Sequence, residues 1–342
     1  MTISNNGTDS SWQLYRYTPN KAAAGIFTAL FIVATILSIL TLYRCATKNK
    51  HTVYPSSSTA NGFSLRFYSP VKLIGPYIPS IVGCALEVIG YIARCVSCNN
   101  QTKITPYVIQ NVLVLIAPTL FAASIYMIFG RMSHLMFSEN LMIMPARFNT
   151  TIFVLGDVVS LLMQAGGGGL MASESGRVTG SHVLTGGLFV QIIFFGLFII
   201  NEFLFLFKLS RKTNPISEKV NWKKLNIVLL FNSFLILLRS IIRVIEAIEG
   251  FDGYIQSHEW FLYIFDALLM FVLCVLHALI MLKANIFKIQ EDSITAQYAN
   301  IHITNSNNLG RTESQLFSEK FYGENIQTQE FGTHSSKNLA YE

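Results

Sequence analysis

Seven ionisable side chains stand within or at the edges of long apolar runs, where ordinary surface charges do not occur. They are Glu87, Asp157, Glu202, Arg239, Arg243, Glu246 and Asp266. An ionised group in hydrocarbon costs about 2.5–3.5 kcal/mol on insertion scales, so it persists only when it is paired or faces a wet interior. Groups of this kind bind cations, relay protons or hold helices together, and they are the candidate functional residues of this chain.

Spacing places several of these groups on shared helical faces. Arg239, Arg243 and Glu246 are separated by four and three residues, which stacks them on one face and allows an Arg243–Glu246 pair. The same four-and-three spacing recurs between Glu87 and Arg94. Such pairs either fix how the helices pack or receive a charged ligand.

A polar stripe follows the fourth apolar run. Asp157, Ser160, Gln164 and Gly168 recur at spacings of three, four and four, so we expect them to share a face that points away from lipid. The glycines at 166–169 either let a neighbouring helix approach closely, which we favour, or unwind the run beside a ligand cavity.

The runs that carry these residues are long enough to cross a membrane. A spanning helix needs about 20 mainly apolar residues. Seven runs qualify: 22–43, 73–93, 107–129, 151–172, 181–207, 225–246 and 260–282. The sequence therefore predicts an all-α integral membrane protein with seven transmembrane helices.

Composition leads to the same class. Of the 342 residues, 51% are hydrophobic and only 13% are charged, about half the charged share of a soluble domain. The mean hydropathy is +0.44. These values exclude an ordinary cytosolic enzyme and a disordered chain, and five cysteines are too few for a disulfide-built secreted domain.

The loops predict the direction of the spans. With the N-terminus outside, the three short inner loops carry thirteen Lys and Arg residues, against five on the opposite side. Because basic residues accumulate in cytoplasmic loops, we expect the N-terminus outside and the C-terminus in the cytoplasm. This bias also explains the net charge of +6 without a nucleic-acid partner.

The two ends of the chain have different expected roles. Residues 1–21 form an extracellular segment without a cleavable signal peptide, and Asn6 lies in a glycosylation sequon there. Residues 283–342 are rich in Asn, Ser, Thr, Gln and Glu, so we expect a disordered cytoplasmic tail.

Depth divides the ionisable groups into two layers. At about 1.5 Å per helical residue, Glu87, Arg239 and Asp266 lie at one level below the outer boundary. Arg243 and Glu246 are shallower, so opposite charges share this outer layer.

The inner layer contains only acids. Asp157 and Glu202 fall in the inner third of their spans and lack an obvious intramembrane cation. They are therefore the better site for an ammonium group.

The sequence lacks the motifs of ATP hydrolysis and of zinc-dependent catalysis. The sequence has no G-x-x-x-x-G-K-[ST] loop for ATP and no H-E-x-x-H zinc motif. His182, His258 and His277 fall at different depths, so one metal ion does not reach all three. We expect no cofactor, no metal, no nucleotide and no enzymatic activity.

Motifs on separate spans resemble one fungal family. They are Tyr17-Thr18-Pro19, the segment from Glu87 to Arg94, Ala117-Pro118-Thr119 with Ser124-Ile125-Tyr126, Gly156 to Ser160 with Gln164, and Arg239 to Arg243 with Glu246. Over residues 15–290 the chain is similar to the fungal lipid-translocating exporter family, also called the RTA-like family. The resemblance implies seven spans, an outer N-terminus, resistance to toxic amphiphiles and, in relatives, release of sphingoid long-chain bases.

Two functions follow as hypotheses. The first is an exporter without its own ATPase, in the plasma membrane, that moves cationic amphiphiles such as aminosterols or long-chain bases. Its partners are membrane lipids or amphiphilic small molecules. The alternative is a receptor-like sensor of membrane lipid state or toxic amphiphiles. Deleting the chain after Asn285 should abolish a sensor's output and leave a translocator active.

Overall fold

Seven long helices dominate the computed structural model. It describes residues 20–48, 59–60, 63–99, 104–143, 146–171, 173, 175–211, 214–250 and 253–301. The elements are α1 (Lys21–Lys48), β1 (Thr59–Ala60), β2 (Phe63–Ser64), α2 (Pro70–Ile74), η2 (Gly75–Tyr77), α3 (Ile78–Asn99), α4 (Ile104–Leu135), η3 (Glu139–Leu141), α5 (Ala146–Leu170), α6 (Arg177–Arg211), α7 (Pro215–Lys219), α8 (Trp222–Glu249), α9 (Tyr254–Ser257), α10 (Glu259–Leu262), η4 (Tyr263–Leu268) and α11 (Leu269–Lys283).

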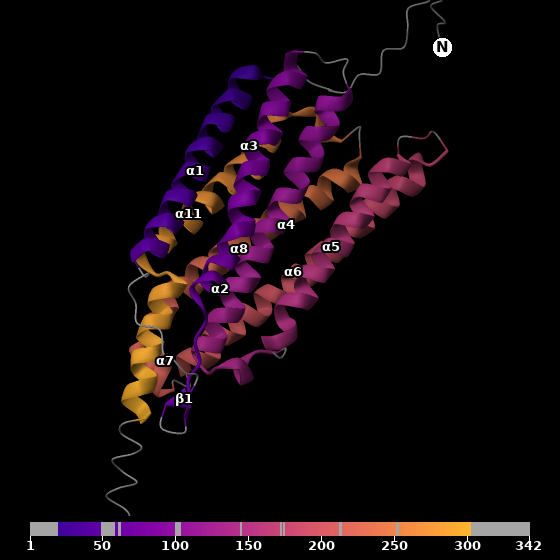
Figure 1. The fold of residues 1–342 in the computed structure, drawn as a ribbon. Helices are drawn as coiled ribbons and strands as arrows, with labels where there is room; N and C mark the ends of the chain where they lie inside the picture. The colour runs from indigo at the N-terminus through magenta and orange to yellow at the C-terminus, as the bar shows by residue number, and fades with distance from the viewer. Residues whose placement is uncertain are drawn as a thin grey trace, which may run out of the picture.

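The long helices lie side by side in a bundle (Figure 1), and their contacts close this bundle into a ring. In chain order, α1, α3, α4, α5, α6, α8 and α11 each pack against the next, and α11 returns to α1. Helix α8 also meets α4 across the ring. All seven segments are long and apolar enough to cross a bilayer, so the predicted all-α, seven-span class is confirmed. The outer position of the N-terminus remains a prediction.

The helices extend beyond the apolar runs at most of their ends. The second segment covers Pro70–Asn99, because α2, η2 and α3 follow one another without a break, and the sixth covers Trp222–Glu249. The fourth ends close to the predicted limit, at Leu170. Hydropathy marks only the part of a helix that lies in hydrocarbon, whereas the helices themselves continue into the headgroup region.

The prediction of a disordered tail is wrong for residues 286–301, which form a further helix. Helix α11 ends at Lys283, and Ala284 leaves the helical conformation with φ −145° and ψ 77°. The Asn285 side chain then accepts a hydrogen bond from the Lys288 backbone at 2.7 Å, which starts the new helix. The apolar face of this C-terminal helix is buried, including Phe287. Residues 302–342, the Asn6 sequon and most of the segment 1–21 lie outside the described residues.

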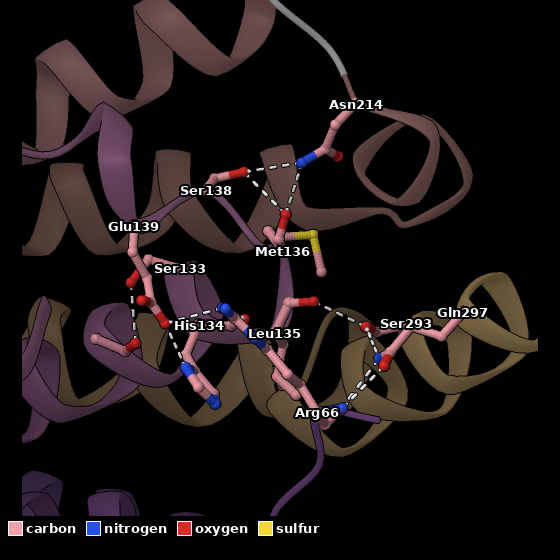
Figure 2. Close-up of polar contacts among 11 residues, drawn as sticks. Arg66, Ser133, His134, Leu135, Met136, Ser138, Glu139, Asn214, Ser293 and Gln297 are labelled. Carbon is pink, nitrogen blue, oxygen red and sulfur yellow. Dashed lines mark hydrogen bonds and ion pairs between the residues drawn. The ribbon is translucent and has the colours of Figure 1, made fainter. Parts of the chain in front are cut away.

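Side-chain amides hold the C-terminal helix to an extended segment before α2. Gln297 accepts from the Arg66 backbone N–H at 2.8 Å and donates to its carbonyl at 3.1 Å. Gln290, two turns earlier, makes the same pair of bonds with Tyr68, at 2.8 and 3.0 Å. Figure 2 shows Gln297 beside Arg66, with Ser293 bonded to the last turn of α4. The C-terminal helix is therefore part of the folded bundle.

Candidate functional site

The ionisable residues expected near the outer boundary lie together. Arg239 pairs with one oxygen of Asp266, and Arg243 donates to the other at 2.9 Å. The predicted Arg243–Glu246 pair is confirmed, at 3.1 Å. Glu87 is buried nearby and interacts electrostatically with Asp266 and Arg239, but one of its oxygens has no hydrogen-bond partner among the described residues. We call the other four residues, Arg239, Arg243, Glu246 and Asp266, the paired layer.

Two irregular features of the backbone help to position the side chains of the paired layer. Asp266 lies in η4, a π-helical turn near the start of the seventh span, and such turns change the direction of side chains within a helix. On α4, Pro118 has no N–H, so the Val114 carbonyl lacks its usual helical donor. Arg239 supplies one, with Nη2 2.9 Å from the Val114 oxygen.

A second ion pair closes the end of the bundle at which α1 begins. Arg94 Nη2 lies 2.7 Å from Glu259, and the Tyr263 hydroxyl donates to the same carboxylate at 3.1 Å. The Asn20 backbone N–H donates to both Glu259 oxygens. These contacts join the start of α1 to α3 and α10. The sequence placed Glu259 in an outer loop and gave no role to Tyr263.

The two inner acids have no such partners. Asp157 accepts a hydrogen bond from the Tyr126 hydroxyl at 3.0 Å, and Glu202 accepts one from Ser233 at 3.1 Å. The second oxygen of each carboxylate has no hydrogen-bond partner among the described residues, although Asp157 is only 4% exposed and Glu202 is 0% exposed. Neither forms an ion pair with another described residue. We call Asp157 and Glu202 the acidic pair.

Aromatic rings fill the space around the acidic pair. The Tyr126 and Phe198 rings meet edge to face with centroids 4.4 Å apart, and Glu202 follows Phe198 by one helical turn. The Tyr126 hydroxyl also interacts electrostatically with both acids. Because these rings are fully buried, a ligand reaches the acidic pair only when the surrounding helices move apart.

Three members of the polar stripe on α5, Asp157, Ser160 and Gln164, are buried, as expected, and the last two contact α6. Ser160 donates to the Gly187 carbonyl at 2.8 Å. Gln164 donates both to Ser160, at 2.7 Å, and to Gln191 on α6, at 3.1 Å. Gln164 therefore links α5 to α6 and does not touch the acidic pair directly.

The prediction that Gly168 is the fourth member of the stripe is wrong, because Gly167, and not Gly168, faces α6. A Cβ at Gly167 would lie 2.5 Å from the Leu184 nitrogen, whereas a Cβ at Gly168 would meet nothing within 4 Å. With 3.6 residues per turn, the stripe takes a step of three after Gln164 instead of four. Helix α5 stays helical to Leu170, so close packing, and not unwinding, explains the glycine run.

A polar stripe on α8 was missed. Asn226, Ser233 and Ser240 recur every seven residues, and all three are buried. The amide atoms of Asn226 and of the neighbouring Asn232 have no hydrogen-bond partner among the described residues. Ser233 of this stripe donates a hydrogen bond to Glu202, and Arg239 lies further along the same helix. The spacing of seven was visible in the sequence and could have identified it.

Among the residues that the structure describes, no group of three or more His, Cys, Asp or Glu side chains could hold a metal ion. His277 lies in the core, with Nε2 3.4 Å from the Ser124 hydroxyl. Cys95 and Cys98, near the C-terminal end of α3, are free thiols.

Comparisons with known proteins agree with the motifs. The family model described as RTA1 like protein matches residues 80–290. Protein RTA1 of Saccharomyces cerevisiae is 54% identical over 287 residues, which cover 84% of this chain and 90% of that protein. Protoporphyrin uptake protein 1 of the same yeast is 44% identical, over 84% of this chain and 98% of its own length.

A more distant relative is named for a lipid substrate. Sphingoid long-chain base transporter RSB1 of Saccharomyces cerevisiae is 28% identical over 223 residues, which cover 54% of this chain and 58% of that protein. No solved structure matches the chain.

Proposed function

This chain belongs to the RTA1-like protein family, and we propose that it translocates cationic amphiphiles across the membrane in which its seven helices lie. The names of its relatives support a role in membrane transport, since one is a sphingoid long-chain base transporter and another a protoporphyrin uptake protein. The substrates are a sphingoid base or an aminosterol, the compartment is the plasma membrane, and movement is toward the outer leaflet.

The acidic pair carries this proposal. A buried carboxylate without a counter-ion is costly, so it is suited to hold either a proton or an ammonium group. Asp157 and Glu202 each keep one oxygen without a partner among the described residues. The amine of a sphingoid base supplies the missing donor, while its hydrocarbon chain stays among the apolar side chains.

The paired layer supports a different step. Asp266 is already neutralised by Arg239 and Arg243, so it offers little to an incoming cation. The α8 stripe lies between the two sites and supplies polar groups along the way. We propose that the substrate amine binds at the acidic pair, follows α8, and leaves beside the paired layer, with a proton replacing it on the carboxylate.

Replacing the acidic pair tests this function. Asp157→Asn and Glu202→Gln keep the shape of each side chain but remove its charge. Cells that express either variant at the wild-type level should lose resistance to a sphingoid base or an aminosterol. Wild-type resistance in both variants would sink the assignment.

Two controls separate charge from damage to the fold. Glu246→Gln removes an acid from a half-buried pair at the outer end, and we expect it to retain resistance. Asp157→Glu keeps the charge and should restore part of the activity that Asp157→Asn loses.

The deletion that tests the sensor alternative has to begin later in the chain than the sequence suggested. Removing everything after Asn285 would delete the docked C-terminal helix as well as the tail, so the deletion has to begin after Ile301. A translocator should keep moving the amphiphile after that shorter deletion. A sensor that signals through the tail should lose its output.

A further inference from the structure

A basic cavity opens at the end of the bundle where α11 gives way to the C-terminal helix. It has a volume of about 130 Å³, well above the roughly 10–15 Å³ that one water molecule needs. Lys224 of α8, Lys283 of α11 and Lys288 of the C-terminal helix line it, with Asn221 and Asp292. Three separate segments therefore each contribute a lysine to the lining of one cavity.

The described residues that line the cavity carry unbalanced positive charge. Three lysines face one aspartate, which leaves two positive charges. Asp292 interacts electrostatically with Lys288, but none of the three lysines forms an ion pair with another described residue. An anion with two negative charges matches this lining.

Two helices begin at the cavity wall. Helix α8 starts directly after Asn221, whose side chain makes no capping hydrogen bond to the described α8 backbone. The C-terminal helix starts directly after Asn285, which also lines the cavity. The Asn285 side chain caps the Lys288 N–H of the C-terminal helix, but the positive end of each helix dipole still adds to the attraction for an anion.

The position of the cavity indicates a lipid headgroup. Lys283 ends the apolar α11 helix, and Trp222 begins α8, so the cavity lies at the headgroup level of the bilayer. The positive-inside bias predicts that this is the cytoplasmic side, where basic pockets between helices bind phosphorylated lipid headgroups. The side-chain amides of Gln290 and Gln297 form hydrogen bonds that hold the C-terminal helix in place. This helix provides one wall of the cavity.

We propose that this cavity binds the phosphate monoester of an anionic membrane lipid. A phosphate monoester carries about 1.5 to 2 negative charges near neutral pH, which matches the two unbalanced positive charges. The site is distinct from the acidic pair and does not depend on what the protein transports. The occupied site holds the C-terminal helix against the bundle.

Native mass spectrometry of the purified full-length protein tests the proposal. The probes are dioctanoyl phosphatidylinositol 4-phosphate, dioctanoyl phosphatidylinositol and inorganic phosphate. We expect phosphatidylinositol 4-phosphate, the monophosphate lipid, to bind at least about tenfold more tightly than phosphatidylinositol, which has no phosphate monoester. Inorganic phosphate should compete only weakly. Equal binding of inorganic phosphate and the lipid would overturn the assignment to a lipid.

A matched pair of triple variants tests the cavity itself. Lys224→Gln with Lys283→Gln and Lys288→Gln should weaken binding of the monophosphate lipid by about tenfold or more. The control replaces Arg211, Lys219 and Lys223 by Gln. These three residues lie near the same end but do not line the cavity, so their loss should change affinity about twofold or less. Equal losses in both triples would show only general attraction to a basic surface and would overturn the proposal.

A single variant covers the case in which the triple does not fold. Lys288 is exposed, so Lys288→Gln should fold normally and weaken binding by about threefold, while Lys223→Gln should not change it. Unchanged affinity in Lys288→Gln would contradict the site.

Discussion

The paired layer and the acidic pair contain the same kinds of buried side chain in opposite electrostatic situations. In the paired layer, both oxygens of Asp266 meet arginine groups, and Arg239 also satisfies a carbonyl that Pro118 leaves free. In the acidic pair, each carboxylate meets one hydroxyl, from Tyr126 or Ser233, and no described cation.

The difference separates structure from function. A buried ion pair with complete hydrogen bonding holds helices in register, and removing one partner leaves the other charge uncompensated. A buried acid with an unused oxygen does little for packing, so its presence indicates a ligand or a proton. We therefore expect changes in the paired layer to affect folding and changes in the acidic pair to affect transport.

The largest expected effect follows from breaking the paired layer. Arg239→Leu leaves Asp266 with one arginine and the Val114 carbonyl without a donor, so stability should fall by about 3–5 kcal/mol. Thermal unfolding in detergent, followed by size-exclusion chromatography, measures the loss.

The control for this change is Glu246→Gln, whose pair with Arg243 is about one quarter exposed and should cost at most about 1 kcal/mol. If Arg239→Leu keeps wild-type stability but stops transport, the roles assigned to the two regions are reversed.

A smaller effect is expected at the α5–α6 contact that positions Asp157. Gly167→Ala forces the Leu184 backbone away from a Cβ that would otherwise lie 2.5 Å from its nitrogen, at a cost of about 1–3 kcal/mol. Gly168→Ala meets nothing within 4 Å and should be neutral or slightly stabilising. The difference between the two melting temperatures measures the effect, and equal melting temperatures would exclude a close approach at Gly167.

The third and smallest of the predicted disruptions, the control variants aside, is at Tyr126. Tyr126→Phe keeps the ring and its contact with Phe198 but removes the hydroxyl that donates to Asp157. Stability should change by less than about 1.5 kcal/mol. Transport should fall several-fold, because the Asp157 carboxylate, whose negative charge attracts the amine, loses the hydrogen bond from the Tyr126 hydroxyl. Initial rates of amphiphile efflux check this, and an unchanged rate would remove Tyr126 from the site.

Local patterns predicted much of this arrangement. The span count, the Arg243–Glu246 pair and the burial of Ser160 and Gln164 all follow from hydropathy and helical spacing, and the structure confirms them. These features depend on residues within one helix, where a spacing of three or four fixes which side chains meet.

Features that depend on two helices could not be read in the same way. No spacing shows that Tyr126 on α4 reaches Asp157 on α5, or that Ser233 on α8 reaches Glu202 on α6. The C-terminal helix was missed because it was read together with the polar residues 302–342, although buried positions 286, 289, 293, 297 and 301 recur at helical spacing. The partners of its glutamines, near Arg66, lie more than 200 residues earlier. Such contacts follow from tertiary packing alone.

The central claim is that the acidic pair, and not the paired layer, handles the amphiphile. Purified protein in liposomes, with a fluorescent long-chain base added to one leaflet, tests it most directly. Wild-type protein should accelerate exchange between leaflets and respond to a pH gradient, while the double variant Asp157→Asn/Glu202→Gln should fold but behave like empty liposomes. Wild-type exchange in a folded double variant would contradict the claim.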